Sequence, residues 1–243
     1  MLSIQANSVT SELPVPAVTI PRVNQLLGSL PEEEYRRLLP HLRHVALTTR
    51  QTFQRCGQPI QEIVFPLAGV CSMVKTTDDG HSIELLGIGR DGAVGASVAW
   101  GQAESPADIV VQIADTGALS LPLDVFKSEM QRGSALADVI SDYCRAAALQ
   151  LMQASACNAL HSVEQRCSRW LLTTQDRVQT NSLPITQELL AMALGVRRPT
   201  VTLVMAVLQR DGLVTYGRGR MTIANRDALV GRACECYAVL SPS

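Results

Sequence analysis

The sequence predicts an α+β protein in which an antiparallel β-roll of jelly-roll type precedes a long helix and a C-terminal winged helix-turn-helix. Three observations predict it: short strand-like runs before about residue 123, a long helical stretch without Gly or Pro after residue 134, and a helix–turn–helix–hairpin pattern over 185–223. Apolar residues recur about every second position in strands and about every 3.6 positions in helices. We divide the chain into a flexible arm (1–22), a β-roll sensor domain (23–133), a dimerisation helix (134–160) and a winged helix-turn-helix domain (161–243).

The β-roll is predicted from strand-like runs that are separated by turn signals. The runs are rich in Val, Ile and Leu, and Gly, Pro and Asp between them favour turns. Many short strands at such spacing favour an antiparallel barrel or sandwich. The runs are 62–65, 70–74, 82–86 and 109–113, and the turns are 56–59, 78–80, 90–92 and 115–117.

A long helix is predicted over 134–160, with many Ala and Ser residues beside one apolar stripe. A helix of about 25 residues spans about 37 Å, which is longer than one domain requires. We therefore interpret it as a dimerisation helix that also separates two domains. The alternative is a core helix within a monomer. The stripe consists of Leu136, Ile140, Tyr143, Ala147, Leu151, Ala154 and Leu160.

The winged helix-turn-helix is predicted from the order of its local signals. Thr186 is a good helix N-cap, and Gly195 ends that helix in a tight turn. A second helix follows, with one buried stripe at i, i+3, i+4 and i+7, and 212–223 reads as a β-hairpin. The first helix of such a motif braces the second, which presents its N-terminal side chains to a DNA major groove. The buried stripe is Val201, Val204, Met205 and Leu208.

Charge is divided unevenly along the chain. From Leu160 onward there are ten Arg or Lys against six Asp or Glu, whereas the residues before it have eleven against sixteen. A basic module on an acidic body suggests a partner that carries phosphates. No apolar stretch has membrane-spanning length, and residues 1–21 lack the pattern of a signal peptide, so we expect a cytoplasmic protein without membrane contact.

The succession of β-roll, long helix and winged helix-turn-helix resembles the Crp/Fnr family of bacterial transcription regulators. The resemblance runs from about Val23 to Tyr237 and is most specific over 186–202 and 211–214. It implies a homodimer formed through the long helix, binding to palindromic double-stranded promoter DNA, contact with RNA polymerase, and an effector in the β-roll. It also implies a regulator rather than an enzyme, and the chain lacks GxSxG, HExxH, P-loop and GxGxxG motifs.

The predicted recognition helix departs from the family pattern. Members often carry Arg-Glu-Thr at its start and another Arg four residues after the Glu, whereas this chain has Arg198-Pro199-Thr200 and Leu203. The acceptor for a cytosine amino group is therefore absent, Leu203 offers only apolar contact, and Arg198 is our candidate for reading a guanine. The other candidate DNA contacts, mostly to phosphates, are Thr186, Gln187, Arg197, Thr200, Thr202, Arg218 and Arg220.

The candidate effector pocket, Gly95, Ala96, Ser97 and Trp100, departs further. Cyclic-nucleotide members use a Glu for the ribose and an Arg for the phosphate, and here Ala96 and either Ala107 or Asp108 occupy those positions. Because a buried phosphate without a cation is costly, we expect no control by cAMP or cGMP. We expect instead that Val98, Ala99 and Trp100 fill the β-roll, so that DNA binding does not require an added ligand.

We predict no metal or cofactor. Iron–sulfur members use an N-terminal Cys cluster, but the first of seven Cys here is Cys56, and the stretch used by haem members has neither Cys nor His. Cys157 and His161 are spaced to share a metal on a helix, but without further ligands in view a packing role is favoured, and Cys234-x-Cys236 is equally ambiguous. The alternative function is a ligand- or redox-sensing module whose C-terminal domain serves mainly protein interaction.

Overall fold

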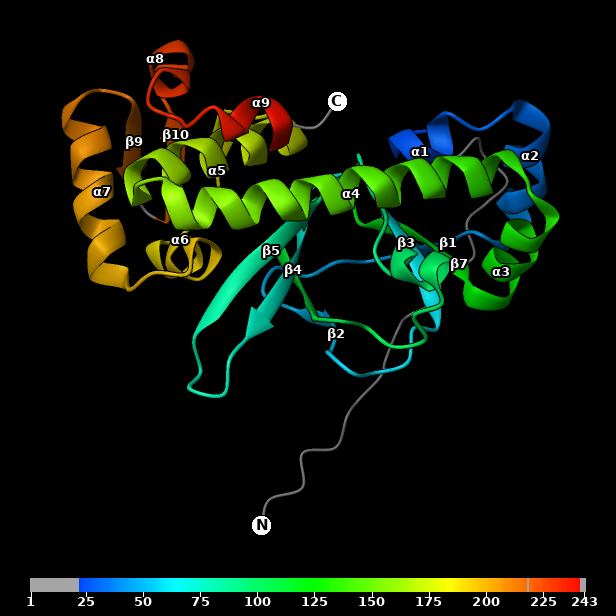
Figure 1. Cartoon of the computed structure of the whole chain (residues 1–243). Coiled ribbons are helices and arrows are strands. Elements are labelled where there is room, and N and C mark those ends of the chain that lie inside the picture. The colour runs from blue at the N-terminus through cyan, green and yellow to red at the C-terminus, as the bar shows by residue number, and fades with distance from the viewer. Residues whose placement is uncertain (1–21, 218, 241–243) are drawn as a thin grey trace.

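The computed structural model describes residues 22–217 and 219–240 of the chain. The arm predicted at 1–22 lies outside this range except for its last residue, and so does Arg218. The described residues form an N-terminal α/β body, a long helix along the whole molecule, and a C-terminal helical module with a small sheet (Figure 1).

The N-terminal body is an antiparallel β-roll, as predicted. One sheet has the order β1-β7-β3 and the other the order β2-β6-β4-β5, and every pair is antiparallel. Both faces of β3 are buried, because successive side chains point to opposite faces of the sheet. Ile63 and Phe65 belong to an apolar cluster shared with the flanking helices, whereas Val64 belongs to a second cluster with Val111 of β6. The strands are β1 (Arg43–Val45), β2 (Thr52–Gln54), β3 (Glu62–Pro66), β4 (Val70–Thr76), β5 (Ser82–Ile88), β6 (Asp108–Ile113) and β7 (Ala118–Pro122).

Short helices close one end of the β-roll. Asn24 caps the first of them by accepting from the backbone N–H groups of Leu26 and Leu27, and its amide donates to the Pro66 and Gly92 carbonyls at 3.0 Å each. This buried Asn therefore ties the entry of the chain to the β-roll. The helices are α1 (Gln25–Gly28), α2 (Glu32–Leu38), η1 (Leu39–His41), η2 (Ala96–Trp100) and α3 (Leu123–Arg132).

The long helix α4 (Ala135–Leu160) occurs where the sequence predicts it. The predicted apolar stripe packs mostly on the chain's own N-terminal body: Leu136 and Ile140 are fully buried, and Tyr143 and Leu151 are half-buried against the same body. Helical periodicity marks a buried face without saying what covers it, and here the chain's own N-terminal body covers most of this stripe.

The C-terminal module follows α4 after a break at residues 161 and 162. Ser162 and Gln165 form a reciprocal capping box at the start of the next helix. A three-stranded antiparallel sheet of order β8-β10-β9 and four further helices surround a second apolar core. The elements are α5 (Val163–Val178), β8 (Ser182–Leu183), α6 (Gln187–Leu194), α7 (Arg198–Arg210), β9 (Val214–Gly217), β10 (Arg220–Ile223), α8 (Arg226–Val230) and α9 (Cys236–Leu240).

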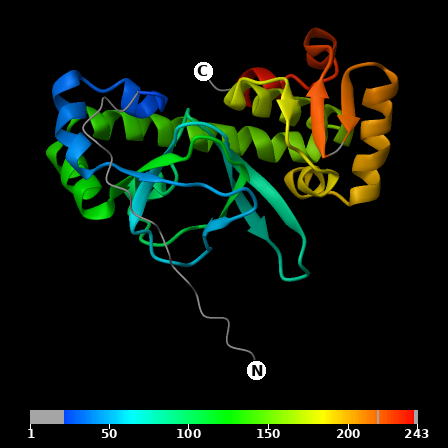
Figure 2. The ribbon, with the colours of Figure 1, turned by 180° about the vertical axis from the view of Figure 1, so that it is seen from behind.

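The two bodies flank α4 and contact one another through the β4–β5 hairpin, which reaches toward α6 (Figures 1 and 2). Gly195 at the end of α6 shows how close this contact is, because a Cβ there would lie 2.7 Å from the Ile83 Cδ1 of β5. Among the described residues, no single helix is long and apolar enough to cross a membrane; only α6 and α7 together, bent by 108°, have the required length and composition.

Candidate nucleic-acid interface

The helices α6 and α7 form the predicted helix-turn-helix. The Thr186 side chain accepts from the backbone N–H of Leu189 at 3.2 Å, and Gly195 ends α6 at a φ of 61°. Positive φ is a conformation that Gly adopts without steric cost. The angle of 108° between the two helices lies in the range of helix-turn-helix motifs, about 90–120°.

One face of α7 is buried and the other is open. Val201, Met205 and Leu208 are essentially inaccessible and Val204 is half-buried, which confirms the predicted stripe. Pro199 lies in the first turn, where the backbone N–H that it lacks would have no partner in the helix. The exposed residues of α7 and its N-cap are Arg197, Arg198, Pro199, Thr202, Leu203, Ala206, Gln209 and Arg210.

The candidate base-reading residue, Arg198, is exposed and already has a partner. Its Nε lies 3.0 Å from a Glu188 carboxylate oxygen, and both side chains are more than 60% exposed. An ion pair this exposed contributes about 0–1 kcal/mol, so a nucleic acid could displace Glu188 at small cost. Next to it, the Thr202 hydroxyl donates to the Gln187 side-chain oxygen at 2.8 Å. These contacts thus bring three of the predicted residues, Gln187, Arg198 and Thr202, together where α6 meets α7.

Leu203 is 70% exposed, although it is a large apolar residue in a helix that buries its other apolar side chains. Packing within the chain therefore does not account for it. An exposed aliphatic side chain near the start of a recognition helix has the shape to contact a thymine methyl group.

The wing is the hairpin β9–β10. Strand β10 also pairs with β8, and Arg220 is oriented by two bonds to Ser182: Nε donates to the hydroxyl at 3.1 Å and Nη2 to the carbonyl at 3.2 Å. The side chain remains exposed despite these bonds. Arg218, the other predicted wing contact, lies outside the described residues.

Another basic residue of this module, Arg210, lies at the opposite end of α7 from Arg198. Arg210 occupies the last turn of that helix and pairs with Asp211 at 3.0 Å. Asp211 also accepts from Arg232, and the hydrogen bonds from these two guanidiniums lower the pKa of its carboxyl. The C-terminal end of α7 is therefore fixed by charge pairs within the module.

The predicted effector pocket is a tightly packed corner. Gly95 has a φ of 83°, and a Cβ there would lie about 3 Å from the Glu62 carbonyl and from two Ile side chains of β3 and its approach. Ala96 is buried, and its carbonyl lies 3.6 Å from the Cys144 thiol of α4. Ser97 is half-buried.

Trp100 does not fill the β-roll, so that expectation was wrong. Its side chain is 59% exposed at the end of η2, whereas Val98 and Ala99 pack half-buried against the sensor core. The sequence shows a bulky apolar residue but not the turn that directs it outward at Gly101, where φ is 83°.

The residues at the positions of the family's phosphate site make contacts within the β-roll. Ala107 is fully buried, and Asp108 accepts from the backbone N–H of Cys56 at 2.8 Å. Elsewhere on the β-roll, Tyr143 of α4 packs on Gly92, and burial raises the pKa of the Tyr143 hydroxyl.

Polar contacts between the two bodies were not predicted from the sequence. The Trp170 indole N–H of α5 donates to Glu84 of β5 at 2.9 Å, and Arg177 pairs with Asp91 at 3.3 Å with both side chains largely buried. Glu84 also accepts from Ser72 and Gln112 within the β-roll. No motif marks such contacts, because they join residues about 86 positions apart in the chain.

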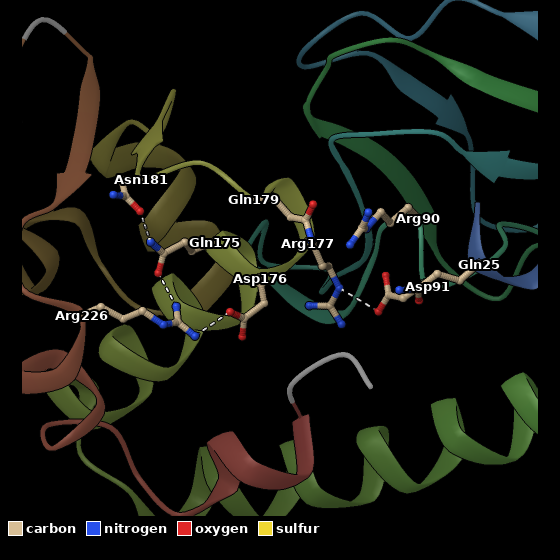
Figure 3. A pocket seen from close by; sticks show the side chains of 9 residues that line it. All are labelled: Gln25, Arg90, Asp91, Gln175, Asp176, Arg177, Gln179, Asn181 and Arg226. Carbon is tan, nitrogen blue, oxygen red and sulfur yellow. Dashed lines mark hydrogen bonds and ion pairs between the residues drawn. The ribbon is translucent and has the colours of Figure 1, made fainter. Parts of the chain in front are cut away.

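A polar pocket of about 560 Å³ lies beside this contact (Figure 3). Two of its three arginines pair with carboxylates: Arg177 faces Asp91, and Arg226 pairs with Asp176 at 2.7 Å. The pocket is therefore a mixed-charge seam between the sensor body and α5. Its lining is Gln25, Arg90, Asp91, Gln175, Asp176, Arg177, Gln179, Asn181 and Arg226.

Comparison with known proteins identifies the C-terminal module and the fold. Residues 165–232 match the family model of the Crp-like helix-turn-helix domain. A Crp/Fnr-family regulator from Eubacterium rectale has a TM-score of 0.66 at 19% identity, and the alignment covers 85% of this chain and 96% of that one. No curated protein sequence matches the chain.

Two further solved structures are similar over most of the chain. A CRP-family transcriptional regulator from Thermus thermophilus has a TM-score of 0.62 at 18% identity, covering 78% of this chain and 98% of that one. The c-di-GMP-responsive global regulator CLP of Xanthomonas campestris has a TM-score of 0.66 at 17% identity, covering 80% and 100%. At these identities the likeness shows a common fold.

Proposed function

We propose that this Crp/Fnr-type transcription regulator, whose residues 165–232 form a Crp-like helix-turn-helix domain, binds palindromic promoter DNA as a homodimer. The observation that carries the proposal is the open N-terminal face of α7, where Arg197, Arg198 and Leu203 project from a helix braced by α6. Arg198 reads a guanine through its two donors, and Leu203 contacts a thymine methyl group. Arg197 and Arg220 hold phosphates.

The homodimer is supported by the outward face of α4. Leu149 and Met152 are 55% and 68% exposed, and the small residues Ala156 and Ala159 continue the same face at alternating steps of three and four residues. That spacing is the seam of a coiled coil. Two copies joined along this seam would present two α7 helices to half-sites about 34 Å apart.

Control by cyclic AMP is not part of the proposal. Ala96 and Ala107 are buried and offer no charged side chain, and Asp108 carries the wrong sign for a phosphate. Val98, Ala99 and the Tyr143 side of α4 support a sensor body that is packed by its own side chains, so DNA binding proceeds without an added ligand. Calorimetry with millimolar cAMP or cGMP should show no binding, and micromolar affinity would contradict this part. The same titration with c-di-GMP, the effector named for the Xanthomonas protein, tests that ligand.

The test of DNA binding is selection of duplexes from a random pool, followed by affinity measurements with three single variants. Arg198→Ala should cost about 1–3 kcal/mol at one base pair of each half-site and relax the preference there. Arg220→Ala should weaken binding to all sequences alike and lower the salt dependence. Arg210→Ala, the matched control at the far end of the same helix, should change neither.

A protein-interaction role for the C-terminal module is the alternative. It predicts that no sequence is enriched in the selection and that wild-type affinity for DNA stays at the non-specific level. Equal losses on selected and random duplexes for Arg198→Ala would refute its base-reading role while leaving DNA binding intact. Contact with RNA polymerase is a further proposal from the family resemblance, testable by co-sedimentation on promoter DNA.

A further inference from the structure

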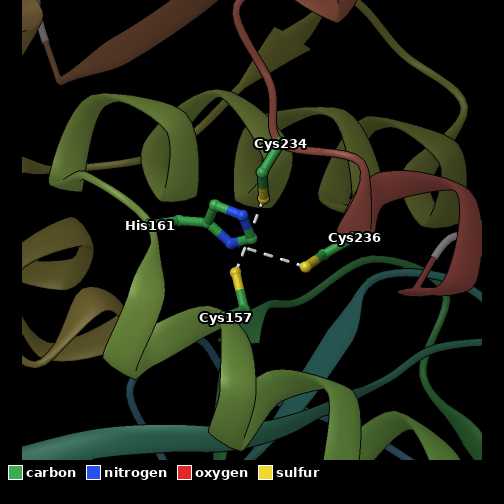
Figure 4. A group of neighbouring side chains, drawn as sticks. All are labelled: Cys157, His161, Cys234 and Cys236. Carbon is green, nitrogen blue, oxygen red and sulfur yellow. Dashed lines mark hydrogen bonds between the residues drawn. The ribbon is translucent and has the colours of Figure 1, made fainter.

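Four potential metal ligands meet where α4 ends. Cys157 lies in the last turn of α4 and His161 is its C-cap residue, while Cys234 and Cys236 belong to the segment that begins α9. Their Sγ atoms and an imidazole nitrogen all lie within 4.8 Å of one another. Figure 4 shows the four side chains pointing toward one another from these two segments.

The distances fit tetrahedral coordination of one ion. Zinc binds Cys sulfur at about 2.3 Å and His nitrogen at about 2.0–2.1 Å, which in a tetrahedron separates two sulfurs by about 3.8 Å and a sulfur from a nitrogen by about 3.6 Å. The Sγ atoms of Cys157 and Cys234 are 3.5 Å apart, and Cys236 Sγ is 3.6 Å from His161 Nδ1. A disulfide needs about 2.05 Å, and both thiols are free.

The neighbours of the ligands have the chemistry of an outer coordination shell. His161 Nε2 lies 3.2 Å from a Glu235 carboxylate oxygen, an arrangement that holds the proton on Nε2 and leaves the Nδ1 lone pair facing the sulfurs. The Gln153 amide of α4 donates to Cys236 Sγ at 3.0 Å. Carboxylate–histidine and amide–sulfur contacts of this kind orient metal ligands.

Two arginines supply compensating charge. Three thiolates around a divalent ion leave one net negative charge, which is costly to bury without a cation. Arg166 and Arg169 of α5 both interact electrostatically with Cys157, and Arg166 is 8% exposed. Within the described residues the Nε–H groups of both arginines are buried and have no acceptor. A negatively charged metal–thiolate centre gives these guanidiniums the counter-charge that they lack.

We propose that Cys157, His161, Cys234 and Cys236 form a tetrahedral Cys3His site for zinc. Soft sulfur with imidazole in this geometry is the ligand set that zinc takes in proteins, and four protein ligands leave no open position, so the site is structural. Neither pair of ligands signals a metal alone, and 77 positions separate Cys157 from Cys234. Only the packing of α9 on α4 completes the set.

The site has a mechanical consequence for the regulator. It ties α9 to the last turn of α4, directly at the break over residues 161 and 162 where the chain passes into α5. Among the residues that the structure describes, Leu240 is the one member of the buried apolar cluster under α9 besides the three thiols. Metal coordination therefore fixes the position of α9, and with it the angle at which α5 and the DNA-binding helices leave α4.

The first test is metal content and cobalt spectroscopy on the full chain. Protein purified under reducing conditions and dialysed after zinc addition should retain about one zinc per chain. Replacement of zinc by cobalt should give the intense visible bands of tetrahedral Co²⁺ and thiolate-to-cobalt charge transfer in the near ultraviolet. Reduced wild-type protein without zinc and without these bands would overturn the proposal.

The second test uses variants and thiol labelling. Cys234→Ser, Cys236→Ser and His161→Gln should lose zinc, whereas Cys56→Ser, at an exposed position, and Cys144→Ala, buried in the sensor body, should retain it. If the variants do not fold, alkylation of the cysteines in the wild-type protein is the test instead. A zinc chelator should expose Cys157, Cys234 and Cys236 to the reagent while Cys71, Cys144 and Cys167 stay protected.

Two outcomes contradict the site. Equal alkylation of the three thiols with and without chelator would mean that no metal protects them. A mass two hydrogens below that of the reduced chain, with a Cys157–Cys234 cross-linked peptide in protein prepared without oxidant, would assign the cluster to a disulfide instead.

Discussion

The two halves of α4 are held by different chemistry. Between Ala135 and Cys144 the helix is anchored by apolar burial, since Leu136 and Ile140 are inaccessible in the cluster that they share with β3, β7 and the short helices. Between Leu149 and Leu160 the same helix exposes its largest apolar side chains and buries Cys157 in a cluster of thiols. The hydrophobic effect within the chain therefore fixes the first half, whereas the second half carries surface that suits a second copy and ligands that suit a metal.

The largest effect is expected where the first half of α4 is buried. Ile140→Ala removes a fully buried side chain and should lower the free energy of unfolding by about 2–5 kcal/mol, through lost burial and the cavity left behind. Urea denaturation followed by circular dichroism measures it. Asp142→Ala, at a position 72% exposed on the same half, should stay within about 0.5 kcal/mol of wild type. Similar losses for both variants would show that the two faces of this half do not differ as described.

The outward face of the second half of α4 should determine the affinity of dimerisation rather than the stability of the fold. Leu149→Arg combined with Met152→Arg places two like charges on each side of the proposed seam and should weaken dimerisation at least about a hundredfold, which is about 3 kcal/mol. Analytical ultracentrifugation over a concentration series measures the change, and circular dichroism should remain that of the wild type.

The control for assembly adds the same charge elsewhere. Gln102→Arg with Gln131→Arg changes two exposed positions of the sensor body and should leave the dimer intact. An unchanged sedimentation coefficient for the Leu149/Met152 double variant would mean that α4 does not carry the dimer interface.

The sequence predicted what depends on local patterns. The cap at Thr186, the turn at Gly195 and the buried stripe of α7 are each determined by residues within about one turn of helix, so spacing and residue type were enough. The same holds for the strands of the β-roll, where turn residues mark the ends.

What the sequence did not predict depends on which distant surface covers a residue. The stripe on α4 has the periodicity of a buried face, but only the packed chain shows that the β-roll covers it. Trp100 was expected inside because it is large and apolar, and the turn at Gly101 directs it outward. The four ligands at the end of α4 were visible as two separate pairs, and the docking of α9 that brings them together has no local sequence signal.

The smallest expected effect concerns a direct hydrogen bond between α5 and the β-roll, which does not involve α4. Trp170 of α5 donates its indole N–H to Glu84 of the β-roll, so that the C-terminal module contacts the β-roll directly. Trp170→Phe keeps most of the apolar ring but removes the donor. Hydrogen bonds to charged groups contribute about 1.5–3 kcal/mol, but Glu84 keeps its bonds from Ser72 and Gln112, so we expect a loss of about 1 kcal/mol.

This loss is measured as a shift in the urea midpoint, with Trp100→Phe as the matched control, since Trp100 is exposed at the tip of η2. Trp170→Phe should also raise hydrogen exchange in β5 and α5 without changing exchange in the first half of α4, because that half is held by its own apolar core. Equal effects of the two substitutions would show that the indole–carboxylate bond does not hold the two bodies together. In that case the β-roll and the C-terminal module would be connected mainly by α4 with its two differently anchored halves, together with the Arg177–Asp91 pair.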